Sequence, residues 1–158
     1  MNNLTHSFPQ GPKIAVHFLT KPDGNIRVRL LKSEEFTVSF FAKLPLTFQE
    51  EVMQWLLAYS RKEPTPLLDL PRQILPPFSK KVLDAMVKIP FGKTLSYGEI
   101  AEKAGSEGAS RAVGTICRLN DFPLFIPCHR VLPKTGGIGN YSLGVPIKDV
   151  LLKFEGVL

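Results

Sequence analysis

Cys128, His129 and Arg130 follow one another after Pro127 in the 158-residue chain. They place a soft nucleophile, a base and a fixed positive charge together. A free thiol has a pKa of about 8.5, and a neighbouring imidazole and guanidinium favour its ionisation. Because residues 125–127 are apolar, we expect Cys128 at the edge of a core with little mobility, which lowers the entropic cost of an aligned attack.

Proton transfer from this thiol needs a base that is held in place. Adjacent side chains of an extended chain point to opposite sides, so we expect Cys128 and His129 to communicate through a water molecule. Glu155, at the end of a predicted helix over 146–155, is the candidate that orients His129. The pattern predicts a Cys–water–His–Glu relay, whereas Glu155 taken alone reads as a surface acid near a helix end.

Residues 136–144 contain four glycines in nine positions, together with Tyr141 and Ser142. Glycine allows close approach of the backbone to a ligand. The segment either covers a pocket, with Tyr141 packing on a flat ligand and Ser142 offering a hydrogen bond, or is a plain connection.

Two short helices precede the cysteine. Ser96 and Glu99 form a capping box for the first, which Gly105 ends, and a second helix is predicted from about Gly108. Two helices joined by such a turn are typical of a helix-turn-helix. The outward face of the second helix carries Arg111, Gly114, Thr115 and Arg118. Glycine costs about 1 kcal/mol inside a helix, so small residues between arginines favour close approach to a duplex over a merely solvated face.

The N-terminal part has a different pattern. Alternating apolar residues predict strands over 13–20, 25–31 and 35–41, arranged as an antiparallel meander. A helix with a Thr47–Glu50 capping box then covers the sheet. Several prolines between 64 and 77 indicate a linker. We therefore expect an N-terminal α/β lobe over 1–70 and a mostly helical C-terminal domain over 71–158.

Composition narrows the function classes. The net charge is +6, and residues 71–158 hold 12 Lys and Arg against 7 Asp and Glu, which suits a polyanion such as DNA but also a solvated lysine-rich surface. The only cysteines are Cys117 and Cys128, which argues for reduced thiols. Residues 1–10 show no secretion signal and no long apolar run occurs, so we expect a cytoplasmic protein, or a nuclear one in a eukaryote.

Six segments together resemble one family. Order and spacing are similar to those of the O6-alkylguanine-DNA alkyltransferases over about residues 77–156, whereas residues 1–70 match only in layout. The resemblance implies a C-terminal winged helix-turn-helix lobe bearing the cysteine. The segments are Pro90–Ala101, Ser110–Gly114, Asn120, Ile126–Val131, Gly139–Ser142 and Leu151–Gly156.

By this resemblance Cys128 irreversibly accepts an alkyl group from O6 of guanine in double-stranded DNA, and from O4 of thymine if that base is also a substrate. The protein would act once, as a monomer without a cofactor. His129 would act as base through water, Glu155 would orient it, Asn120 would support the network near the thiol, and Tyr97 would donate to the departing purine. Arg130 would be a local structural and electrostatic support.

The resemblance also implies how DNA is held. Arg111 would enter the base stack, the amide near Ser142 would bond O6, and the carbonyls of Cys128 and Val131 would read the exocyclic amine. DNA would be approached through the minor groove. The implied DNA-binding residues are Ser96, Tyr97, Arg111, Ala112, Gly114, Thr115 and Arg118, and the implied substrate-pocket residues are Phe122, Pro123, Val131, Tyr141 and Ser142.

Some positions depart from the family pattern. Asp121 stands where proline is usual, Leu143 replaces a frequent glycine, and Cys117 lies in the second helix. We expect Leu143 to narrow the pocket, so that methyl is accepted faster than bulky groups. Some members bind zinc in the N-terminal lobe, but here that lobe has only His6 and His17 and no cysteine, which predicts no structural zinc.

Three other functions remain open at this point. A Cys-His hydrolase would turn over and need no DNA. A DNA-lesion sensor on the same scaffold would bind without reacting, and the intact Cys128 argues against it. A redox or metal sensor using Cys117 and Cys128 lacks a recognisable ligand spacing.

Overall fold

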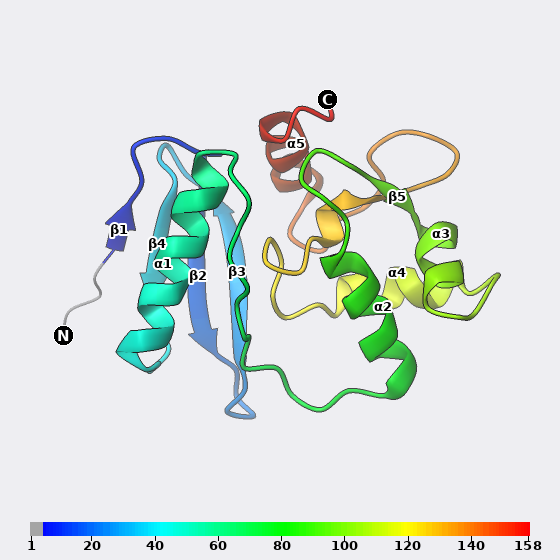
Figure 1. Ribbon diagram of the computed structural model, residues 1–158, viewed down its shortest axis with the longest axis horizontal. Helices are drawn as coiled ribbons and strands as arrows, with labels where there is room; N and C mark the ends of the chain where they lie inside the picture. The colour runs from blue at the N-terminus through cyan, green and yellow to red at the C-terminus, as the bar shows by residue number, and fades with distance from the viewer. Residues whose placement is uncertain (1–4) are drawn as a thin grey trace. The chain divides into compact units, whose positions relative to one another are not determined.

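The computed structural model describes residues 5–158, which divide into two compact units at Gln73 and Ile74 (Figure 1). Residues 1–4, part of the stretch predicted to carry no secretion signal, lie outside the described residues. In the part of the chain that is described, no helix is both long and apolar enough to cross a membrane. The structure is of the α/β class, with helices and a mixed sheet.

The first unit is a four-stranded sheet with the order β1-β4-β2-β3. Its strands are β1 (Thr5–Ser7), β2 (Ile14–Thr20), β3 (Ile26–Lys32) and β4 (Thr37–Phe40). Strands β2 and β3 form an antiparallel hairpin with Val16 opposite Leu30. Strand β4 pairs in parallel with β2 and antiparallel with β1.

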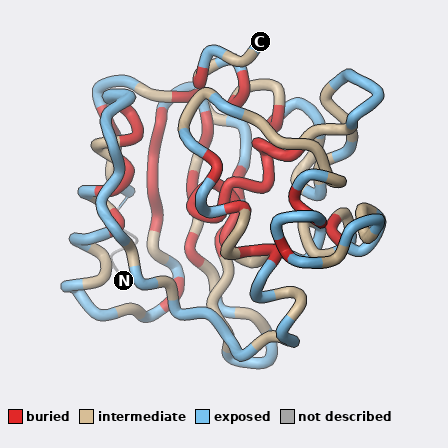
Figure 2. The backbone as a smooth tube through the Cα atoms, turned by 45° about the vertical axis from the view of Figure 1, so that its right-hand side comes forward, coloured by how far each residue is buried: buried red, intermediate tan, exposed pale blue. Residues whose placement is uncertain are grey.

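The predicted antiparallel meander is therefore wrong in its strand order. After β3 the chain crosses to the far side of β2, and β4 inserts between β2 and β1 instead of extending the sheet from β3. Thr37, Val38 and Ser39 are all buried, as suits a central strand, and long buried stretches run along the sheet (Figure 2). Alternation of apolar residues specifies a strand but not the neighbour with which it pairs.

Helix α1 (Leu46–Ser60) buries the apolar stripe that its period predicted, including Val52, Trp55, Leu56 and Tyr59. Aromatic contacts from Phe48 to Phe18 and from Tyr59 to Phe36 join it to the sheet unit. The predicted Thr47–Glu50 capping box is absent, because the helix already begins at Leu46 after Pro45 and no side chain caps it.

The second unit contains four helices among its described residues, together with a short sheet and a 3₁₀ turn. The helices are α2 (Pro77–Val87), α3 (Tyr97–Lys103), α4 (Ser110–Arg118) and α5 (Val145–Phe154). Strands β5 (Leu95–Ser96) and β6 (Val131–Leu132) pair in parallel. The turn η1 (Cys128–Arg130) leads directly into β6.

Local signals set the helix ends in this unit. The Ser96–Glu99 capping box is present in full at the start of α3, and Pro77 occupies the first turn of α2. Gly105 follows α3 with φ +83°, a conformation that favours glycine. These short elements place β5 and β6 side by side, so that Ser96 and the residues after Cys128 come together.

Candidate active site

Cys128 lies at the inner wall of a pocket. Residues 122–131 are buried without interruption, and Cys128 itself is 3% exposed. The carbonyl of Ile126 accepts a hydrogen bond from the Cys128 amide at 2.8 Å, which helps to close the turn. The thiol is therefore held on a rigid, buried segment, as the apolar residues before it predicted.

Asn120 braces this segment. Its Nδ2 donates to the Ile126 carbonyl at 2.9 Å and to Cys128 Sγ at 3.3 Å, while its Oδ1 accepts from the Phe122 amide at 3.0 Å. One amide side chain thus ties both ends of the 120–128 connection to the reactive sulfur. Burial raises the pKa of the Cys128 thiol, and the donor that Asn120 aims at the sulfur partly opposes that effect.

His129, Arg130 and Glu155 form a buried cluster. Glu155 Oε2 lies 2.6 Å from His129 Nε2, and Arg130 donates to Oε1 at 2.8 Å from Nε and to Oε2 at 3.2 Å. The guanidinium also donates to the Ile89 carbonyl at 2.7 Å. The Gly92 amide adds a weaker bond to Glu155 at 3.3 Å. Arg130 therefore neutralises Glu155, so His129 need not be charged.

The protonation states follow from this arrangement. Burial opposes the charge of Glu155, but bonds from His129 and Arg130 outweigh it and lower the pKa of Glu155 to about 2. Burial lowers the pKa of His129, with Glu155 partly opposing that effect. A neutral imidazole beside an ionised carboxylate carries its proton on Nε2 and leaves a lone pair on Nδ1. Nδ1 is buried and has no hydrogen-bond partner within residues 5–158.

The segment around Cys128 is a 3₁₀ turn, so the extended chain expected there is wrong. The prediction that Cys128 and His129 communicate through water assumed side chains on opposite sides of an extended chain, and the chain is not extended here. His129 turns its Nε2 toward Glu155, and Nδ1 forms no bond to the sulfur or to any other described residue. A site for a bridging water on Nδ1 stays a prediction.

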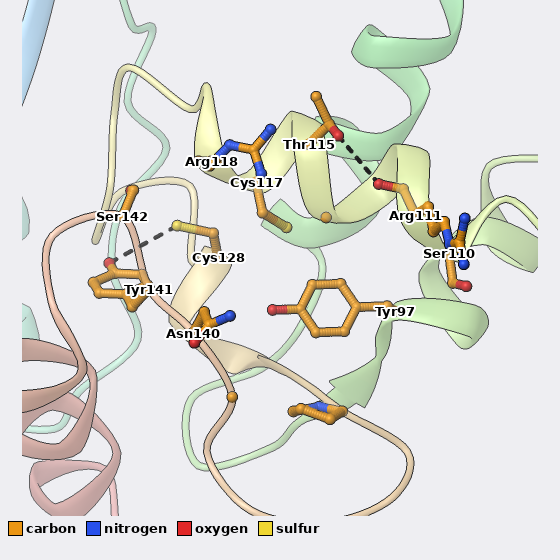
Figure 3. A pocket seen from close by; sticks show the side chains of 13 residues that line it. Tyr97, Ser110, Arg111, Thr115, Cys117, Arg118, Cys128, Asn140, Tyr141 and Ser142 are labelled. Carbon is orange, nitrogen blue, oxygen red and sulfur yellow. Dashed lines mark hydrogen bonds between the residues drawn. The ribbon is translucent and has the colours of Figure 1, made fainter.

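The pocket beside the thiol has a volume of about 680 Å³. Figure 3 shows that it is enclosed by α4, Tyr97 and the loop that carries Tyr141. Its lining residues are Tyr97, Ser110, Arg111, Gly114, Thr115, Cys117, Arg118, Cys128, Pro133, Gly139, Asn140, Tyr141 and Ser142. Sequence reasoning named eight of these as site residues and missed Ser110, Pro133, Gly139 and Asn140, and it named Cys117 only as a departure.

Tyr97 and Tyr141 approach the thiol from different elements. The Tyr97 hydroxyl points into the pocket on the Cys128 side, and burial raises the pKa of Tyr97, so this phenol keeps its proton. The Cys128 thiol donates to the Tyr141 hydroxyl at 3.8 Å (Figure 3). The glycine-containing loop thus covers the pocket and is more than a plain connection. Ser142 lines the same wall.

Helix α4 presents exposed arginines at the rim of the pocket. Arg111, Thr115 and Arg118 are exposed, and Thr115 Oγ1 donates to the Arg111 carbonyl at 3.2 Å. Ala112 is exposed on the same helix but does not line the pocket. Ser96 serves as the N-cap of α3. Two exposed arginines therefore lie on the α4 side of a pocket that contains a buried nucleophile.

Three predicted substrate-pocket residues do not line the pocket. Phe122, Pro123 and Val131 are buried in the core behind Cys128. Nearness in sequence to the reactive residue does not determine which side chains face the pocket, and these three are buried away from it. The Val131 carbonyl, predicted to read an exocyclic amine, accepts a bond from Lys148 Nζ at 2.9 Å.

Cys117 is a poor second nucleophile. Its thiol donates to Met86 Sδ at 3.5 Å, and burial raises its pKa to about 12. At neutral pH this thiol stays protonated, which disfavours a redox or metal role for the two cysteines. Within residues 5–158, no group of three or more His, Cys, Asp or Glu side chains could hold a metal ion.

Lys148 is a site residue that sequence reasoning missed. It is fully buried on α5, where only the apolar stripe was expected to face inward. A signal was available, since Lys148 precedes Glu155 by seven residues, two helical turns, and so shares its face.

Residues 77–157 match the family described as "6-O-methylguanine DNA methyltransferase, DNA binding domain". This match spans just over half of the chain. The chain belongs to this family. The match contains every element that builds the pocket, from α2 through α5.

Relatives of the alkyltransferase family agree with this assignment. A protein from Methanosarcina acetivorans named methylated-DNA–protein-cysteine methyltransferase is 46% identical over 79 residues, or 50% of this chain and 51% of its own length. The human protein of the same name is 40% identical over 117 residues, covering 68% of this chain and 56% of its own. The chain thus spans about half the length of these curated relatives.

The solved structure titled Mycobacterium tuberculosis OGT in complex with DNA is similar across both units. It has a TM-score of 0.63 and 28% identity, and the match covers 89% of this chain and 92% of that one. The methyltransferase of Pyrococcus kodakaraensis has a TM-score of 0.57 at 22% identity, which supports the fold alone.

Proposed function

We propose that this protein repairs alkylated DNA by direct reversal, transferring an alkyl group from O6 of guanine irreversibly to its own Cys128. The observation that carries the proposal is a buried thiol in a pocket whose rim is the arginine-bearing helix α4. The relatives named methylated-DNA–protein-cysteine methyltransferase support the same reaction. Alkylated O4 of thymine would be a second substrate of the same chemistry.

In this proposal the N-terminal α/β lobe accompanies a winged helix-turn-helix domain. Helices α3 and α4 supply the two helices, with α4 as the recognition helix, and the loop between β6 and α5 acts as the wing. The capped start of α3 and the positive-φ glycine after it support a fixed angle between the two helices.

The thiol loses its proton before or during attack. A water on His129 Nδ1 carries this proton to the imidazole, while Glu155 holds the ring by Nε2 and stabilises the imidazolium that forms. Arg130 keeps Glu155 ionised throughout. Asn120 donates to the sulfur and so lowers the cost of its negative charge.

The transfer is a displacement at the alkyl carbon. The sulfur forms an S–C bond, the C–O6 bond breaks, and its electron pair leaves on guanine. Tyr97, held protonated by burial, donates a proton to the purine as it leaves. A thioether is not hydrolysed under these conditions, so each molecule acts once and needs no cofactor.

DNA must bring the lesion to the thiol. An alkyl group on O6 is unreachable inside the stack, so the nucleotide must be flipped at a cost of a few kcal/mol, which a mispaired lesion lowers. We propose that Arg111 fills the gap in the base stack. We also propose that α4 approaches the minor groove, because the small side chains of Gly114 and Thr115 let the helix lie close to the duplex. Ser96, Ala112 and Arg118 would contact the sugar-phosphate backbone, which makes binding salt-dependent.

The proposal extends to the protein's setting. We propose a monomer that acts in the cytoplasm, or in the nucleus of a eukaryotic cell. The two exposed arginines of the α4 rim favour duplex DNA as its partner.

Intact-mass spectrometry tests the reaction. The protein is incubated with duplex DNA that carries one O6-methylguanine, and the alkylated peptide is mapped. We expect a gain of one methyl group at Cys128, stopping at one per molecule. Cys128→Ser is expected to gain none, while Cys117→Ser, the matched control, keeps the reaction.

Other outcomes identify other functions. An unchanged mass with tight lesion binding would indicate a sensor. Repeated turnover of a thioester without DNA would indicate a hydrolase. Methylation of Cys117 alone would refute the assignment of the acceptor.

A further inference from the structure

Lys148 is a buried cation that the proposed reaction does not yet use. Its side chain is fully buried on α5, beside Ile147, Leu151 and Leu152. Lysine is almost never buried unless its charge is compensated. In the part of the chain that the structure describes, no carboxylate forms an ion pair with it, and its hydrogen bonds go to two backbone carbonyls. A charge held in this way points to a function.

The two bonds of Lys148 join the thiol segment to the loop over the pocket. Nζ donates to the carbonyl of Val131, three residues after Cys128, at 2.9 Å, and to the carbonyl of Asn140 at 3.3 Å. The ammonium also lies 5.9 Å from the centre of the Tyr141 ring. Since the Tyr141 hydroxyl receives the bond from the thiol, Lys148 lies near the ring that accepts this bond and bonds to the carbonyl just before it in the loop.

The loop is shaped to reach Lys148. Gly139 has φ +72°, and a Cβ there would come within 2.7 Å of Pro133 Cγ. Only glycine lets the loop fold back on Pro133 and present the next carbonyl to the ammonium. A substitution at Gly139 would therefore displace the Asn140 carbonyl while keeping the Lys148 ammonium, whose Nζ would lie 4.0 Å from the added Cβ.

Among residues 5–158, the charges around the thiol leave Lys148 as the buried cation without a carboxylate partner. Tyr97 from α3 and Cys117 from α4 line the pocket with Cys128 and keep their protons, because burial raises the pKa of each, and the Tyr141 hydroxyl accepts the bond from the thiol. In the turn itself, Arg130 is paired with Glu155 and His129 bonds to the same carboxylate. Arg111 and Arg118 are exposed at the rim, where water screens them. Burial raises the pKa of Cys128 and lowers the pKa of Lys148, and the attraction between the ammonium and the thiolate opposes both shifts. Lys148 is thus a cation whose field reaches the sulfur through the protein interior.

We propose that Lys148 is a positioning residue for the transfer, whose ammonium pins the loop that carries Tyr141 and whose charge favours the Cys128 thiolate. This inference rests on the proposed function, because it assigns Lys148 to that reaction. Its physical content, a link between Lys148 and the acidity of the thiol, does not require DNA.

The test measures the pKa of Cys128 in the DNA-free protein. The rate of its reaction with iodoacetamide is followed against pH by mass spectrometry of the Cys128 peptide, in Lys148→Met, Lys148→Arg and Lys153→Met. Lys153 is the matched control, being an exposed lysine of the same helix paired with Asp149. At neutral pH we expect Lys148→Met to react about tenfold more slowly, one pKa unit, with Lys148→Arg recovering part of the rate and Lys153→Met unchanged.

Circular dichroism first establishes that each variant is folded. If Lys148→Met does not fold, Gly139→Ala tests the same link from the loop side, and a raised pKa of Cys128 is again expected. An unchanged pKa in a folded Lys148→Met or Gly139→Ala overturns the proposal, as does an equal shift in Lys153→Met. Failure of the wild type to accept a methyl group would refute the proposed function. The effect of Lys148 on the pKa of Cys128 would still be tested, because the iodoacetamide measurement uses no DNA.

Discussion

Glu155→Gln is the substitution whose effect on the free energy of unfolding follows most directly from the structure. The carboxylate accepts hydrogen bonds from His129 and from Arg130 inside the protein. Its pKa falls from 4.5 to about 2, which corresponds to about 3 kcal/mol in favour of the ionised form in the folded state. Glutamine keeps the shape but leaves the Arg130 guanidinium, 8% exposed, without its counter-ion. We expect a loss of about 3–5 kcal/mol, the usual cost of breaking a buried pair.

The effect has a defined pH dependence. The folded-state pKa of Glu155 lies below that of the unfolded chain, so its contribution is fully present above about pH 4.5 and is lost as pH falls toward about 2. The wild type should therefore lose about 3 kcal/mol over this window through Glu155. The difference between wild type and Glu155→Gln should shrink over the same window, because both side chains are then neutral.

The assay must report on the second unit. Trp55, the only tryptophan of the sequence, belongs to the other unit, so its fluorescence is unsuitable. Urea unfolding followed by hydrogen exchange of the α5 amides gives the local free energy at each pH. Asp149→Asn serves as control, since this exposed carboxylate pairs only with Lys153 on its own helix. If the local free energy of unfolding depends on pH in the same way in wild type and in Glu155→Gln, the ionised Glu155 carboxylate does not contribute the expected stability.

Four further predictions concern other residues of the protein. Asn120→Ala should destabilise the protein by about 1–3 kcal/mol in urea unfolding, because buried partners lose their bonds; an unchanged midpoint would contradict this. Arg111→Ala should slow methyl transfer from duplex DNA while leaving transfer from the free O6-benzylguanine base unchanged, as measured by intact mass. Leu143→Gly should narrow the expected preference for methyl over benzyl adducts; equal rates in the unmodified protein would refute it. Metal analysis of the purified protein should find no stoichiometric zinc.

Local interactions made much of the second unit predictable. The Ser96–Glu99 capping box is a contact three residues apart, and the stripe ending at Pro90 depends on helical period. The nucleophile was recognisable because Cys128 follows an apolar segment that keeps it rigid. The predicted Thr47–Glu50 box is absent, because the helix begins at Leu46 and its N-cap is Pro45, so Thr47 already lies inside the helix.

Relations across long stretches of chain were not predictable from pattern alone. The strand over 37–40 has the same alternation whichever neighbour it pairs with, and burial decides that it inserts between β1 and β2. The pocket wall is a similar case, because Phe122 and Val131 lie near Cys128 in sequence but are buried and do not line the pocket.

The amino-acid sequence was sufficient to name the nucleophile, its base and the basic helix beside them, because motif spacing and helical period are properties of neighbouring residues. The protonation of the site required the fold. Only packing brings Glu155 within 2.6 Å of His129 and within 2.8 Å of Arg130. The carboxylate thereby orients the base, while the guanidinium neutralises the negative charge of the carboxylate. Only packing buries Lys148 against the Asn140 carbonyl of the loop, because the environment of a charge depends on everything that excludes water from it.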